Sequence, residues 1–147
     1  MDQPLKLDNP FWQFSLKVYA APGVAQECLK LQDESGVNVN MLLYCAWRGA
    51  EADFLSASTI AQLNEIVRAW RADVVIPLRE VRRSLKSLAS LDPTEIKDLR
   101  AKVLDTEIRA EQIEQALLFG ETASDHLRGD KRAEAIDANL NVYLGGY

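Results

Sequence analysis

Apolar residues recur along the chain at the three- and four-residue spacings of amphipathic helices, and no stretch alternates in the manner of a strand. One long series comprises Leu63, Val67, Trp70, Val74, Leu78, Val81, Leu85 and Leu88. A second comprises Ile96, Leu99, Val103, Ala110, Ile113 and Leu117. Only a short turn separates the two series, so the pattern predicts an all-α protein built on a long antiparallel helical hairpin.

Capping residues divide residues 10–50 into three shorter helices. Asn9 is typical of the residue before a helix, and Gly36 is typical of a helix end. Asn38 or Asn40 then begins a third helix that is apolar nearly all round. We expect this third helix to be the most buried element of the fold.

The expected architecture is a single helical domain over residues 1–147. Three short helices in residues 10–50 pack on the hairpin in residues 57–120, and a last helix occupies residues 130–144. The expected inward face of that last helix is Ala133, Ile136, Leu140 and Tyr143. Pro77 predicts a kink in the first arm of the hairpin, because proline lacks a backbone donor.

Charge is distributed unevenly over the two arms. Residues 58–91 hold six basic and three acidic side chains, whereas residues 92–147 hold seven basic and twelve acidic ones. This asymmetry predicts ion pairs across the hairpin, which set the register of the arms more than they stabilise them. The expected pairs join Arg68 and Arg71 to the region of Glu111 and Glu114.

Four basic side chains share one side of the first arm: Arg79, Arg82, Arg83 and Lys86. Arg79 is expected to face the region of Asp105 across the hairpin. A solvated or internally paired face is the preferred interpretation, and a protein partner or nucleic acid are the alternatives. The net charge of −5 and the absence of aromatic residues among the four disfavour nucleic acid.

No group of residues has the pattern of a catalytic or metal site. The only histidine, His126, directly follows Asp125 and lies two residues after Ser124. A catalytic triad needs its three side chains to converge in space, which adjacency in the sequence does not supply. Glu107, Glu111 and Glu114 share one helical face without the Glu-x-x-His motif of di-metal bundles, which favours a solvated or arginine-paired face. The two cysteines occupy apolar positions typical of buried thiols. We therefore predict no catalytic residue, no metal site and no cofactor.

Large aromatic and short polar residues are mixed in the first third of the chain. The notable members are Trp12, Gln32, Asp33, Asn40 and Trp47. One interpretation is structural, with the tryptophans in the core and the polar groups at helix ends. The alternative is a pocket or groove between the short helices, where these residues converge on a ligand or a partner peptide.

The same region carries a set of motifs. They are Phe11-Trp12, Phe14-Ser15-Leu16, Tyr19, Pro22-Gly23-Val24, Cys28-Leu29, Leu31-Gln32-Asp33, Gly36, Val39-Asn40, Leu42-Leu43 and Trp47. This pattern resembles an uncharacterised family of short helical proteins, a domain of unknown function found mainly in proteobacteria. The resemblance implies a helical, cytoplasmic, bacterial protein, and it carries over no catalytic residue.

These observations favour a non-enzymatic helical protein with an interaction or regulatory role, and a homodimer through the long helices is one arrangement. The alternative is a small-molecule-binding module or enzyme with its site among the N-terminal helices. A weaker alternative is an RNA- or ribosome-associated factor that uses the basic side of the hairpin. No signal pattern opens the chain and no apolar run approaches the ~18 residues that span a membrane, so the expected location is cytoplasmic and no membrane contact is expected.

Overall fold

The computed structural model describes residues 4–88, 93–121 and 132–145, and every regular element in these ranges is helical. The elements are α1 (Pro10–Tyr19), α2 (Val24–Ser35), α3 (Val39–Ala50), α4 (Ala57–Trp70), the π-helical η1 (Arg71–Val75), α5 (Ile76–Leu88), α6 (Thr94–Gly120) and α7 (Arg132–Leu144). The prediction of an all-α bundle is thereby confirmed.

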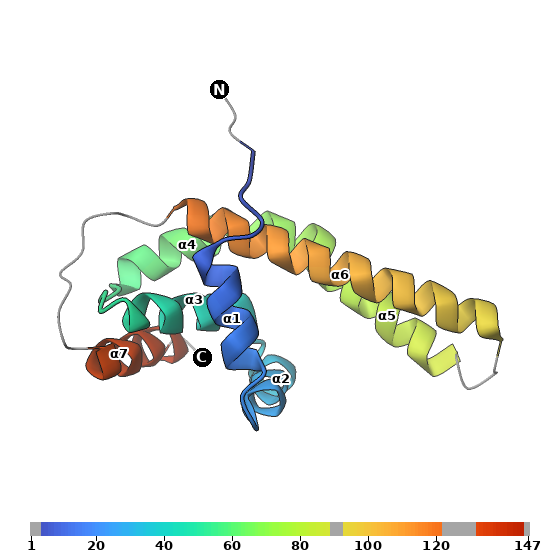
Figure 1. Ribbon diagram of the computed structural model, residues 1–147, viewed down its shortest axis with the longest axis horizontal. Coiled ribbons are helices and arrows are strands. Elements are labelled where there is room, and N and C mark those ends of the chain that lie inside the picture. The colour runs from blue at the N-terminus through green and yellow to red at the C-terminus, as the bar shows by residue number, and fades with distance from the viewer. Residues whose placement is uncertain (1–3, 89–92, 122–131, 146–147) are drawn as a thin grey trace.

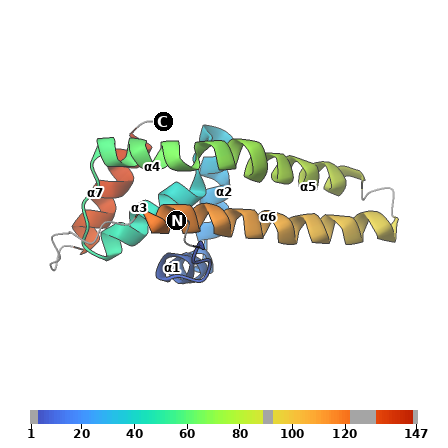
Figure 2. The same cartoon turned by 90° about the horizontal axis from the view of Figure 1, so that it is seen from above.

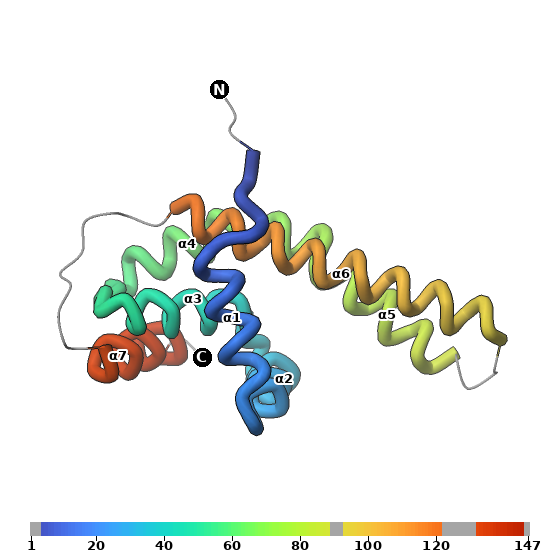
Figure 3. Tube along the Cα trace, viewed as in Figure 1, coloured from blue at the N-terminus to red at the C-terminus, as the bar shows by residue number. Residues whose placement is uncertain are grey.

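A long hairpin organises the molecule. Helices α4, η1 and α5 form one continuous rod, which packs side by side with α6 in the opposite direction (Figure 2). The outer part of α5 and α6 extends beyond the other helices, whereas α1, α2, α3 and α7 gather below the inner part (Figure 1). Figure 3 traces the chain from α1 through a tight turn into α2, below the hairpin. The short N-terminal helices therefore meet the hairpin on one side only.

Helix ends follow the capping residues. The side chains of Asn9, Asn38 and Ser56 each accept a hydrogen bond from a backbone N–H in the first turn of α1, α3 and α4, respectively. Gly36 ends α2 in the left-handed conformation, with φ of 66°, which glycine adopts without steric cost. Because Asn38 caps α3, the side chain of Asn40 is free to point into the interior.

A π turn interrupts the α-helical geometry of the first arm just before Pro77. The N–H of Ile76 bonds to the carbonyl of Arg71, five residues earlier, and the π-helical segment ends just before the proline. Proline has no N–H, and its ring collides with the carbonyl four residues earlier in an α-helix. The wider turn relieves that conflict while the rod continues.

The π turn also changes which residues of the rod face α6. Val75 and Arg79 are buried, whereas Val81 and Leu88 are each 48% exposed. On the opposite arm Leu99 is 52% exposed. The two predicted apolar series therefore do not pack on each other at Val81, Leu88 and Leu99. On the first arm the π turn is the cause, because its wider turn rotates the face of the helix that follows it.

The core lies between α1, α3, α4 and the inner end of α6. The ring of Trp47 stacks on Phe11 with centroids 5.3 Å apart and contacts Phe119 at 5.8 Å. Tyr44 meets Phe11 edge to face at 5.4 Å. Helix α3 is buried over most of its length, as predicted, and both cysteines are buried free thiols. Aromatic packing of this kind dominates the energetics of small cores.

Helix α7 is fixed to α3 by buried polar groups. Asn139 accepts a hydrogen bond from the N–H of Leu55 at 2.7 Å and donates to the carbonyls of Cys45 and Asp53. The hydroxyl of Tyr143 accepts from the N–H of Asn38 at 3.0 Å and donates to its carbonyl at 3.2 Å. These bonds satisfy the backbone around both ends of α3.

The inward face of α7 agrees with the prediction at Ile136, Leu140 and Tyr143 and differs at Ala133. Ala135, Asn139 and Tyr143 are buried, whereas Ala133 is exposed. The prediction followed apolar residues alone, and the structure instead turns the polar Asn139 inward, where backbone groups need a partner.

Gly49 allows α3 and α7 to approach closely. A Cβ at this position would lie 2.5 Å from the Cα of Ile136, whereas a Cβ at Gly120 would meet nothing within 4 Å. We expect Gly49→Ala to lower the free energy of unfolding by about 1–3 kcal/mol or more, because the contact is with backbone that cannot rotate away. Gly120→Ala is the matched control and should leave it unchanged or slightly raised. Urea denaturation measures both, and equal stabilities would contradict this account of the α3–α7 contact.

Candidate functional site

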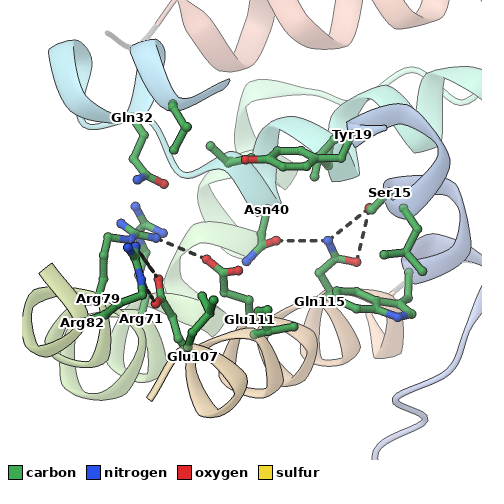
Figure 4. A pocket seen from close by; sticks show the side chains of 17 residues that line it. Ser15, Tyr19, Gln32, Asn40, Arg71, Arg79, Arg82, Glu107, Glu111 and Gln115 are labelled. Atoms are coloured by element: carbon green, nitrogen blue, oxygen red, sulfur yellow. Dashed lines mark hydrogen bonds and ion pairs between the residues drawn. The ribbon is translucent and has the colours of Figure 1, made fainter. Parts of the chain in front are cut away.

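A cavity of about 380 Å³ opens where α1 and α2 meet the hairpin (Figure 4). Its rim consists of exposed apolar or aromatic side chains, namely Leu16, Tyr19, Leu29, Leu104 and Ile108. Its floor consists of buried polar and charged side chains, namely Ser15, Asn40, Arg79, Glu107 and Gln115. We call this cavity the hairpin groove. An apolar rim over a polar floor is the usual composition of a ligand site.

A cluster of buried ion pairs forms one end of the floor (Figure 4). The guanidinium of Arg79 lies 3.7 Å from Glu107 and 3.4 Å from Glu111. Arg82 donates to both oxygens of the Glu107 carboxylate. Arg79 and Glu107 are almost completely buried, so their charges are compensated by each other rather than by water.

These contacts can be compared with the ion pairs that were predicted across the hairpin. Pairing across the hairpin is confirmed, but Arg79 has Glu107 and Glu111 as partners in place of Asp105. The prediction for Arg68 is wrong, because Arg68 is exposed and pairs with Glu65 in its own helix at 3.0 Å.

A chain of neutral hydrogen bonds forms the other end of the floor. The Gln115 side chain donates to the side-chain oxygen Oδ1 of Asn40 at 3.0 Å and to the Ser15 hydroxyl at 3.1 Å. These hydrogen bonds join α1, α3 and α6 beneath the groove (Figure 4). All three side chains are buried, and the bonds hold them in fixed orientations.

Glu114 lies behind this floor and is fully buried. Asn38 donates to one carboxylate oxygen at 2.7 Å, and the other oxygen has no hydrogen-bond partner among the residues that the structure describes. Burial raises the pKa of Glu114 above its ordinary value, against the opposing effects of the Asn38 bond and the charge of Arg71. Burial likewise raises the pKa of Glu111 in the groove.

The comparisons with known proteins give a family. Residues 10–118 match the family described as "Protein of unknown function (DUF2390)", which is well over half of the chain. The chain belongs to this family. The predicted resemblance to a domain of unknown function is thus confirmed, while the proteobacterial origin and the proposed signature stay predictions. No curated protein and no solved structure matches the chain.

The match to the DUF2390 family includes every residue that lines the hairpin groove and ends before α7. In the portions of this DUF2390 chain that the structure describes, no helix is long and apolar enough to cross a membrane. The same portions contain no group of three histidine, cysteine or acidic side chains able to hold a metal ion. His126 lies outside the described residues.

The residues singled out in the N-terminal region separate into three groups. Trp12, Gln32 and Asn40 all line the hairpin groove. Trp47 lies in the core, where its ring contacts other aromatic rings. Asp33 is exposed on α2 and pairs with Arg83 at 2.9 Å. The structure therefore brings together three of the five residues.

The basic residues of the first arm separate in a similar way. Arg79 and Arg82 point into the hairpin groove and are paired with acidic residues of α6. Arg83 pairs with Asp33 of α2, and Lys86 is exposed. They do not form one free basic surface, because the rod presents them to two different neighbours.

Sequence reasoning missed several members of the groove. Leu104 and Ile108 are four residues apart and lie outside the predicted apolar series, and this off-series pair was a usable signal. Tyr19 lines the rim as well. Arg71 lines the groove from the π turn, and Pro77 predicted a kink in this arm rather than a change of helix type.

The buried Glu114 gives a pH-dependent prediction. A carboxyl with a higher pKa in the folded state binds protons more tightly there, so stability falls as pH rises from 4.5 through the raised folded value. We expect Glu114→Gln to become more stable relative to the wild type as the pH rises through this range, because only the wild type loses this contribution to its unfolding free energy.

Urea unfolding at a series of pH values measures this difference, and Glu65→Gln is the control. The pKa of exposed Glu65 is lowered by its bond to Arg68, so its contribution has the opposite sign and is lost as pH falls. A Glu114→Gln difference that is the same at every pH would show that the carboxyl does not titrate differently on folding.

Proposed function

We propose that the protein binds a small amphipathic molecule in the hairpin groove and does not transform it. The observation that carries the proposal is the groove itself, whose volume of about 380 Å³ falls among ligand pockets. Pockets of this kind measure about 300–1,000 Å³ and combine apolar walls with a few convergent polar groups. The apolar rim and the buried polar floor meet both conditions.

The arrangement of the floor favours binding over catalysis. Ser15 is hydrogen-bonded to Gln115, an amide that cannot act as a base. The raised pKa of Glu111 makes it the best candidate for a proton donor, but its nearest charged partner is Arg79. Among the lining residues that the structure describes, none forms a nucleophile–base pair with it.

The ion pairs of the basic residues on the first arm argue against the RNA-binding alternative. Arg79, Arg82 and Arg83 are each paired with a carboxylate of α6 or α2. A phosphate backbone is bound through cations that are available to it. A ligand-binding role agrees with the expected cytoplasmic location.

An uncharged solvatochromic dye, Nile red, tests occupation of the groove. We expect saturable binding with one site per chain, and Ile108→Arg should weaken it by about tenfold or more, because the charge enters the apolar rim. Leu99→Arg is the matched control, since Leu99 is exposed on the same helix but does not line the groove. Equal binding by the two variants would contradict a ligand site in the groove.

A second candidate function is self-association through the outer part of the hairpin, in line with the interaction role that the sequence favours. The observation behind it is the exposure of Val81, Leu88 and Leu99 in this part of the molecule. On this candidate, light scattering at high concentration should give twice the 16.5 kDa of one chain, and Leu88→Arg should restore the single mass. A mass of 16.5 kDa for the wild type at every concentration would remove the homodimer.

A further inference from the structure

We infer that the ligand of the hairpin groove is an aliphatic carboxylate, with its head group on Arg71 and Gln32 and its chain along the apolar rim. The inference rests on the proposed function and adds the chemical class of the ligand.

The charges that line the groove leave one cation without a partner. In the described part of the chain the charged lining residues are Arg71, Arg79, Arg82, Glu107 and Glu111. Arg79 and Arg82 are paired with the two glutamates. The side chain of Arg71 forms neither a hydrogen bond nor an ion pair with any residue that the structure describes. A half-buried guanidinium of this kind is a strong donor to a planar anion.

One neutral amide offers a further donor beside Arg71. The side chain of Gln32 has no hydrogen-bond partner among the described residues, and it points toward the arginines from α2 (Figure 4). Asn40 adds no free donor, because its side-chain oxygen accepts from Gln115 and its NH₂ group acts on Glu114 behind the floor. A carboxylate accepts several hydrogen bonds and donates none, so it complements Arg71 and Gln32.

The balance of charge favours a monoanion over a phosphate. One unpaired arginine matches a single negative charge, whereas a dianion would also meet the nearby carboxylates of Glu107 and Glu111. Glu114 is the remaining acid that acts on Arg71. It lies behind the floor, where it is bonded to Asn38 and forms no ion pair with Arg71.

The rim supplies the surface for an aliphatic chain. Leu16 and Leu29 come from the short helices, and Leu104 and Ile108 come from α6. All four are more than 40% exposed, so each has apolar area that a chain would remove from water. An aliphatic carboxylate thus covers the rim and neutralises Arg71 at the same time.

Decanoate and decanol are the probes, because they share a chain and differ in charge. We expect isothermal titration at neutral pH to show decanoate binding about tenfold more tightly than decanol, since a charge-assisted hydrogen bond separates them. Arg71→Gln should remove this preference by weakening decanoate alone. Arg71→Lys should restore part of it, because lysine keeps the charge without the planar fork.

The controls separate this inference from the proposed function. Arg71 also lines a second, more open hollow of about 350 Å³ that contains Arg68, so Arg68→Gln should leave decanoate binding unchanged. Equal affinities for decanoate and decanol, both lost in Ile108→Arg, would overturn the carboxylate while the groove stands as a ligand site. A preference for decanoate that persists in Arg71→Gln, or is lost in Arg68→Gln, would overturn the assignment to Arg71 in this groove, as would failure of decanoate to bind at all.

Discussion

The buried pairing of Arg79 and Arg82 with Glu107 is the interaction on which the geometry of the hairpin depends. Charged side chains occupy a seam between two helices where apolar ones would serve equally well for stability. A buried ion pair of this kind adds little net stability, but removing one partner costs about 3–5 kcal/mol because the other charge is left unpaired. The pairing therefore allows one register of the two arms and disfavours the others. That register places the floor of the groove.

The π turn explains why these charges meet. An uninterrupted α-helix through Pro77 would continue the apolar face of α4 onto Val81 and Leu88, and the arginines would lie on a different side. The wider turn instead brings Val75 and Arg79 inward. One residue with no backbone donor thus determines both the composition of the seam and the position of Arg71 in the groove.

Local rules in the sequence were sufficient for the elements and insufficient for the site. Helix class, the cap at Asn9 and the buried α3 follow from spacing and capping chemistry that involve neighbouring residues only, whereas the choice of Asn38 over Asn40 does not. The groove depends on side chains from six elements, and its key cation reaches it through a change of helix type. Gln115 and Glu114 illustrate the limit, since nothing in their local pattern distinguishes a buried polar group from a solvated one.

Asn38 occupies a position where three parts of the molecule meet. Its side-chain oxygen caps α3, its side-chain amide bonds to Glu114 of α6, and its backbone bonds to Tyr143 of α7. The loss of any one of these elements leaves buried polar groups on the other two without partners. Fraying of α3, α6 or α7 at this point is therefore opposed by the bonds that Asn38 makes to the other two.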